Sequence, residues 1–208
     1  MTIYQIDAFT NRLFAGNPAA VVPLKKWPED LLMQQIAMEN NLAETAFFVP
    51  SATSGVDYDI RWFTPALEIN LCGHATLASA YVLLEILKEK KKKVVFSSKS
   101  GLLTVTRNKE RLDMDFPSWK PERTEVYPAA LLTSLGNPEI AGIYQHREYI
   151  VELLDEEAVK NCRPDFSIMK QVDRMVIITA PGKKVDFVSR FFAPNAGIDE
   201  DPVTGSAH

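Results

Sequence analysis

The sequence is poor in the residues that metal sites and disulfide frameworks require. It contains two cysteines, Cys72 and Cys162, and three histidines in 208 residues. So few cysteines in an ordinary globular composition indicate a reducing compartment rather than a disulfide-stapled fold. The cysteines and histidines lack zinc-ligand spacing, and the chain has no glycine-rich phosphate loop or nucleotide fingerprint. We therefore expect neither a metal nor a cofactor.

Charge and hydropathy argue against further classes of protein. Lysine and arginine number 23 against 27 aspartates and glutamates, a net charge of −4, so we expect no nucleic-acid partner. No apolar stretch is long enough to span a bilayer, and residues 1–7 lack the basic and apolar runs of a secretory signal. A soluble, cytoplasmic protein without a membrane partner is the expectation. The lysine-rich run 88–93 is typical of a solvated helix C-terminus.

Two stretches of the chain follow one pattern. Arg61-Trp-Phe-Thr-Pro65 leads to Cys72-Gly-His-Ala-Thr76, and Arg190-Phe-Phe-Ala-Pro194 leads to Thr204-Gly-Ser-Ala207. Each is typical of an aromatic strand, a proline turn, an acidic loop and a helix that begins with small residues. Either copy alone is short, but the shared order indicates a duplicated unit. We infer two similar lobes whose helix N-termini supply one site.

The most informative predicted element is a helix from residue 74 to 87 or 88. Apolar residues occupy nearly every face of this segment, and a helix that is apolar all round must be surrounded by other elements. The segment is too short to cross a bilayer, and the elements around it have strand patterns. The sequence therefore predicts a central helix wrapped by a sheet.

Strands alternate with short helices along the rest of the chain. Pro28 can open an early helix that ends at Asn40-Asn41. The prolines of residues 117–128 predict a linker, and hence domains at 1–117 and 118–208. The predicted strands are residues 3–9, 20–22, 45–49, 58–63, 94–97, 102–107, 112–116, 140–145, 149–154, 174–180 and 186–192, with short helices at 155–161 and 165–172 and a last helix that begins at Pro202.

Five of these motifs also resemble those of a known family. Asn17-Pro-Ala-Ala20, Asn41–Phe47, Arg61–Pro65, Cys72–Thr76 and Asp201–His208 match, in order, the PhzF-type phenazine biosynthesis family. The resemblance implies an α+β fold like that of diaminopimelate epimerase, with two pseudo-symmetric lobes, each a curved sheet or barrel around a central helix. Members of the family continue past the last motif, so we expect the second lobe to be incomplete. We also expect a homodimer.

Glu44 is the candidate acid/base. A lone glutamate is usually a surface carboxylate, but Leu42, Ala43 and the apolar residues 46–48 flank this one. Apolar surroundings raise the pKa of a carboxyl group toward neutrality, where the group can take up and return a proton. The resemblance likewise implies that Glu44 is the catalytic acid/base.

His74 stands at the start of the predicted central helix. It could simply bond to nearby backbone, but helix-start N–H groups favour an anion, and Gly73 permits close approach. The resemblance places His74 in the active site, and we expect Gly73 and Ala75 to bind substrate.

Asp201, followed by a proline, has the pattern of a helix N-cap. The resemblance additionally implies catalytic roles for Asp201 and Ser206, which would orient the substrate and relay its proton. Thr204 and Gly205 would offer N–H groups as the second half of an anion-binding cradle.

The two cysteines do not match a two-thiol racemase. The related epimerases and racemases of this fold use one thiol from each lobe, whereas here Ser206 begins the second helix and Cys162 lies in an unrelated polar stretch. We interpret both cysteines as buried or incidental.

Together these residues predict a cofactor-independent isomerase that moves a proton on a small carboxylate-bearing metabolite by general acid/base catalysis. The resemblance suggests a relation to phenazine biosynthesis, although relatives need not share that substrate. The alternative is a non-catalytic interaction or self-associating protein of the same fold. The set Glu44, His74, Asp201 and Ser206 favours the enzyme.

Overall fold

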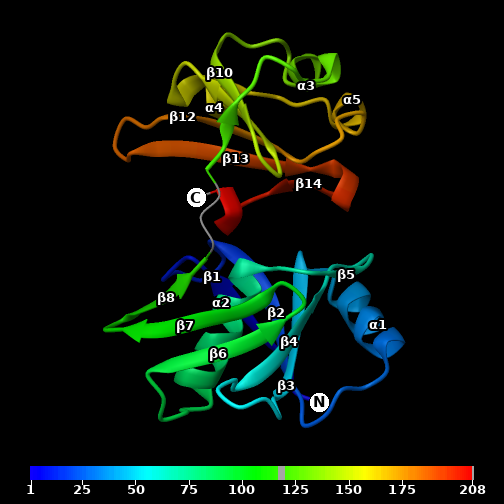
Figure 1. Cartoon of the computed structure of the whole chain (residues 1–208), viewed down its shortest axis with the longest axis vertical. Helices are drawn as coiled ribbons and strands as arrows, with labels where there is room; N and C mark the ends of the chain where they lie inside the picture. The colour runs from blue at the N-terminus through cyan, green and yellow to red at the C-terminus, as the bar shows by residue number, and fades with distance from the viewer. Residues whose placement is uncertain (117–119, 208) are drawn as a thin grey trace. The chain divides into compact units, whose positions relative to one another are not determined.

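The computed structural model describes residues 1–116 and 120–207 (Figure 1). The chain divides into two compact units, residues 1–117 and 118–208. Residues 117–119 of the expected linker lie outside the described residues. The rest of that segment is not wholly irregular, because Glu122–Arg123 form a short strand, β9, that pairs with β10 (Ile140–Gln145).

A curved sheet organises the first unit. Its strand order is β1-β2-β3-β4-β6-β7-β8, and β5 pairs with β4. The strands are β1 (Tyr4–Ala8), β2 (Asn17–Pro23), β3 (Glu44–Pro50), β4 (Tyr58–Phe63), β5 (Glu68–Ile69), β6 (Lys93–Ser98), β7 (Gly101–Asn108) and β8 (Arg111–Asp115). Each predicted strand of this half exists, with ends shifted by a few residues at most, whereas β5 was not predicted.

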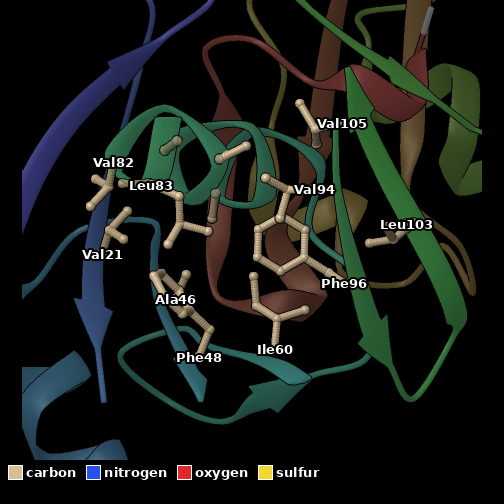
Figure 2. Close-up of a cluster of buried hydrophobic side chains, with 14 of the residues drawn as sticks. Val21, Ala46, Phe48, Ile60, Val82, Leu83, Val94, Phe96, Leu103 and Val105 are labelled. Carbon is tan, nitrogen blue, oxygen red and sulfur yellow. The ribbon is translucent and has the colours of Figure 1, made fainter. Parts of the chain in front are cut away.

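The sheet encloses a helix, as the sequence predicted. α2 (Gly73–Tyr81) contacts β1, β2, β3 and β8 and continues as a π-helical segment, Val82–Ile86. Figure 2 shows Val82 and Leu83 among side chains from β2, β3, β4, β6 and β7. The enclosure is incomplete, because Tyr81 within the segment and Leu87 after it are exposed. The predicted 74–87 helix is therefore present, but its last five residues before Leu87 are π-helical rather than α-helical.

A smaller core covers the other face of the same strands. α1 (Asp30–Asn40) contacts β3 and β4 and buries Met33 and Ala37 against Phe47 and Phe63. The helix begins two residues after Pro28 and ends where Asn41 adopts a left-handed conformation (φ 51°). Asparagine tolerates that conformation better than most residues, which explains the predicted end.

The second unit has a six-stranded sheet in the order β14-β13-β12-β11-β10-β9. Three short helices accompany it, two of them capped by aspartates, since Asp155 accepts from Ala158 N–H and Asp165 from Ser167 and Ile168 N–H. The remaining elements are β11 (Tyr149–Leu153), β12 (Val176–Pro181), β13 (Phe187–Ala193), β14 (Ile198–Asp201), α3 (Ala129–Ser134), α4 (Glu156–Asn161) and α5 (Phe166–Met169).

The predicted last helix does not begin at Pro202. The acidic stretch before it is strand β14, whose Asp201 pairs with Phe191 of β13, and the described chain then forms a 3₁₀ turn at Gly205–Ala207. Pairing with β13 satisfies the backbone of residues 198–201, so Asp201 ends a strand instead of capping a helix. Local capping preference predicted the wrong element because it ignores a neighbouring strand.

The duplication is confirmed by the strand pairing. Along β1 to β5 the successive pairs are antiparallel, parallel, antiparallel and antiparallel. Along β10 to β14 the same series recurs. Among the described helices, none has the length and hydropathy needed to cross a membrane.

Candidate active site

The first part of the candidate site is the N-terminus of α2. Cys72 is the N-cap residue in an extended conformation, and Gly73 and His74 are the first residues of the helix. A side chain at Gly73 would press on Phe116, because a Cβ there would lie 3.2 Å from the ring. The sequence predicted glycine at this position for the approach of a ligand. The structure shows that it also admits a neighbouring aromatic ring.

Glu44 approaches this helix start from β3. It is the first residue of the strand, shortly after the end of α1 at Asn40, and is held in register with Ala19 of the parallel strand β2. Its Oε2 lies 3.3 Å from His74 Nε2, and the side chains of Glu44 and His74 are only 12% and 6% exposed. The structure therefore brings these two predicted residues together in a nearly buried pair. The raised pKa expected for Glu44 stays a prediction.

Cys72 is the residue whose place in the site the sequence did not reveal. Its Sγ lies 3.5 Å from His74 Nδ1, on the other ring nitrogen from the one that faces Glu44. Both cysteines are buried, as predicted, but Cys72 contacts a predicted catalytic residue. The signal that could have found it is a cysteine two residues before a histidine at a helix start.

The same three side chains form a cluster of potential ligands. One ligand atom each from Glu44, Cys72 and His74 can be chosen so that all lie within 4.8 Å of one another. Thiolate, imidazole and carboxylate are all ligands that zinc accepts. Sequence spacing could not predict this cluster because Glu44 lies on a separate strand. The expectation of a metal-free protein stays a prediction.

Ala75 offers only its backbone to a ligand. Its side chain is fully buried in the core around α2, and its carbonyl accepts the Ser79 hydroxyl. The Cys72 carbonyl likewise accepts the Thr76 hydroxyl at 2.6 Å. Both bonds occupy carbonyl oxygens and leave the backbone N–H groups unaffected. The N–H groups at a helix start are the ones that favour an anion.

The other predicted residues lie in the second unit. Asp201 ends β14, and its carboxylate accepts a hydrogen bond from the Thr204 hydroxyl. Gly205 and Ser206 lie in the 3₁₀ turn, and the side chain of Ser206 lies outside what the structure describes. Asp201 and Thr204 also line a pocket of about 240 Å³ beside β13. Among the described residues this turn is 3₁₀, and the expected anion-binding role of Thr204 and Gly205 stays a prediction.

Comparison with known proteins identifies the family. The family described as Phenazine biosynthesis-like protein (PhzC-PhzF) matches residues 6–208. The chain belongs to this family. An uncharacterized isomerase of Pseudomonas aeruginosa is 49% identical over 209 residues, which cover 100% of this chain and 78% of that protein. The crystal structure of a PhzF-family phenazine biosynthesis protein from Enterococcus faecalis has a TM-score of 0.90 and 48% identity, covering 99% of this chain and 78% of the other.

A more distant structure extends the fold relationship. A probable proline racemase from Agrobacterium radiobacter has a TM-score of 0.56 at 11% identity, over 90% of this chain and 70% of that one. Identity this low shows the fold alone. The PhzF-like protein thus has the predicted α+β fold of the diaminopimelate epimerase type. Its family and its relatives' names make it an isomerase-type enzyme.

Proposed function

We propose that this PhzF-like protein is a cofactor-independent isomerase that moves a proton between two atoms of a small, carboxylate-bearing molecule. The observation that carries the proposal is the contact between Glu44 and His74 at the start of α2. A carboxylate that is nearly buried, yet placed at a helix N-terminus, can exchange a proton with a bound molecule while bulk water is kept away.

Each group has a distinct task in this proposal. Glu44 takes a proton from an activated carbon of the substrate and returns it to another. His74 Nε2, 3.3 Å from the Glu44 carboxylate, orients that carboxylate and balances its charge. The N–H groups at the start of α2 favour the substrate's carboxylate, because they carry the positive end of the helix dipole.

We also propose that the second unit supports the same reaction. Asp201 and Ser206 would orient the substrate and assist the proton transfer, as their motif positions suggest. The bond from Thr204 keeps the Asp201 carboxylate in one orientation.

The test is proton exchange in D₂O, followed by ¹H NMR on a panel of small amino and hydroxy carboxylic acids with an activated C–H. We expect at least one compound to exchange with the wild-type protein, and Glu44→Gln to slow that exchange by about 10²–10⁴-fold, the usual contribution of a general acid/base. The control is Glu39→Gln, the same substitution at an exposed position of α1, which should leave the rate unchanged. A Glu44→Gln protein that exchanges at the wild-type rate would refute the role of Glu44.

A further inference from the structure

We propose that Cys72 is a positioning residue of this site, whose thiol exchanges a proton with His74 and so decides which nitrogen of His74 presents a proton to Glu44. This inference deepens the proposed function and rests on it for its catalytic meaning. The physical coupling between Cys72 and His74 can be measured without any substrate.

His74 lies between Cys72 and Glu44. Cys72 Sγ lies 3.5 Å from Nδ1, and Glu44 Oε2 lies 3.3 Å from Nε2. The two contacts use opposite nitrogens of one imidazole ring. Thiol, imidazole and carboxylate therefore form a continuous series, with His74 in the middle.

Neutral His74 can hold its ring proton on either nitrogen. A neutral imidazole carries a proton on one nitrogen and accepts a hydrogen bond at the other. When Glu44 is ionised, Nε2–H can donate to it, and Nδ1 is then the acceptor for the thiol proton of Cys72. When the thiol proton of Cys72 has passed through the ring and Glu44 is protonated, the opposite arrangement holds. Nε2 then accepts from the carboxylic acid, and Nδ1–H faces the thiolate.

These two arrangements are related by movement of protons alone. The S–H bond of Cys72 breaks as an N–H bond forms at Nδ1, and the N–H bond at Nε2 breaks as an O–H bond forms on the Glu44 carboxylate. One proton enters the imidazole and one leaves it, so no group is oxidised or reduced. Cys72 can thus reload Glu44 with a proton through His74.

The location of Cys72 suits a thiol that ionises. It is the N-cap residue of α2, where the helix dipole and a hydrogen bond from Nδ1–H of His74 both favour a thiolate. Cys162 offers an internal contrast, since it is the C-cap residue of α4 and burial raises the pKa of its thiol. The two residues are similarly buried, at 6% and 8% exposure, so a difference in their ionisation would report on their surroundings rather than on access to water.

The first experiment measures each thiol separately. In Cys162→Ala only Cys72 remains, and in Cys72→Ala only Cys162 remains. Thiolate absorbance near 240 nm, followed against pH on the folded proteins, should show Cys72 ionising at lower pH, with at least 10-fold more thiolate than Cys162 at pH 7. Adding His74→Asn to Cys162→Ala should remove most of that difference, with circular dichroism to confirm the fold. The proposal is overturned if Cys72 ionises no earlier than Cys162, or if His74→Asn leaves its titration unchanged.

The second experiment detects the effect on His74 itself. The ¹⁵N chemical shifts of an imidazole distinguish its two tautomers. A purely structural role of Cys72 would leave the balance between those tautomers unchanged. We expect Cys72→Ala to alter the balance of Nδ1–H and Nε2–H forms, and Cys72→Ser, which keeps a hydroxyl donor, to restore it at neutral pH. Identical His74 shifts in the wild type and in Cys72→Ala would refute the coupling, whatever the outcome of the Glu44 exchange test. Coupling without Glu44-dependent exchange would instead refute the proposed function.

Discussion

In the first unit β2 and β3 run parallel, while β3–β4 and β4–β5 are antiparallel pairs. In the second unit β11, β12, β13 and β14 pair in the same sequence of directions. β4 and β13 are therefore equivalent strands, and each carries the motif of an arginine followed by two aromatic residues. Comparing these two strands shows which interactions follow from the motif and which depend on the helices packed against each sheet.

The arginines of the two motifs share two interactions. Arg61 bonds to both carboxylate oxygens of Glu68, on the adjacent strand β5, at 2.8 and 2.9 Å. Arg190 bonds likewise to both oxygens of Glu200, on β14, at 2.7 and 2.8 Å. The guanidinium groups also lie 5.2 and 5.1 Å from the rings of Phe63 and Phe192, two residues after each arginine.

The aromatic residues show where the two units differ. Trp62 belongs to the large core around α2, and Phe63 to the smaller core beneath α1. In the second unit the sizes are reversed, since Phe191 belongs to a small cluster with Ile177 and Ala193, and Phe192 to the main core. Successive strand residues face opposite sides of a sheet, so equivalent sheets have their main cores on opposite faces.

The difference shows that the motif sets the strand pairing but not the position of the core. In the first unit α2 and the π-helical segment after it pack into the core on the Trp62 face. In the described part of the second unit, the short helices α3, α4 and α5 contribute to the core on the Phe192 face instead. The helix that packs on each face decides which aromatic residue carries the stability.

The largest expected effects come from replacing, one at a time, the two aromatic residues of each motif by alanine. We expect Trp62→Ala and Phe192→Ala each to lower the free energy of unfolding by about 3–5 kcal/mol, the usual cost of deleting a buried aromatic side chain. Phe63→Ala and Phe191→Ala should each cost at least about 1 kcal/mol less than their partners, because their clusters are smaller. Urea unfolding followed by circular dichroism measures all four. If the first aromatic residue of the motif were the more costly to replace in both units, or the second in both, the main cores would not lie on opposite faces.

A smaller effect is expected from replacing each arginine by lysine, which cannot make the two-pronged contact with a carboxylate. Arg190 also donates to the carbonyls of Val159 and Cys162 at the end of α4. Arg190→Lys should therefore cost about 1–2 kcal/mol and speed hydrogen exchange in α4, whereas Arg61→Lys should leave α4 unchanged. Arg111→Lys, at an exposed position of β8, is the control. Unchanged hydrogen exchange in α4 would show that the bonds from Arg190 to these carbonyls do not stabilise the helix.

The smallest expected effect is the pH dependence of the Glu68 contact. The hydrogen bond from Arg61 lowers the pKa of Glu68 below its ordinary value of 4.5. A carboxyl group whose pKa is lower in the folded state stabilises the fold above its unfolded pKa, and this contribution is lost as the pH falls through the folded pKa. We expect Glu68→Gln to cost under about 1 kcal/mol at pH 7, because the group is partly exposed.

The same variant should lose less stability than the wild type between pH 7 and pH 3, as measured by urea unfolding at each pH. Glu39→Gln, at an exposed position, should follow the wild-type dependence. An equal loss in Glu68→Gln and wild type would mean that Glu68 does not contribute to the acid sensitivity.

Much of the framework could be predicted from local patterns. Residues 58–63 and 140–145 are strands with the predicted ends, because β-branched and aromatic residues there are bounded by turn residues. Most of the segment after His74 is buried in the core of the first unit, as its many apolar residues predicted. Missed elements such as β5 and β9 have two residues each, which is too short for a periodic pattern to develop.

The sequence by itself determined the strand motifs, the enclosed helix and the candidate residues Glu44 and His74, since each depends on the chemistry of a few adjacent side chains. Only the tertiary structure decided that residues 198–201 form a strand, because the partner that satisfies their backbone is β13. It also decided that Cys72 and Glu44 lie on opposite nitrogens of one imidazole. Their distances depend on how β3 packs against α2, and a linear pattern contains no information about that packing.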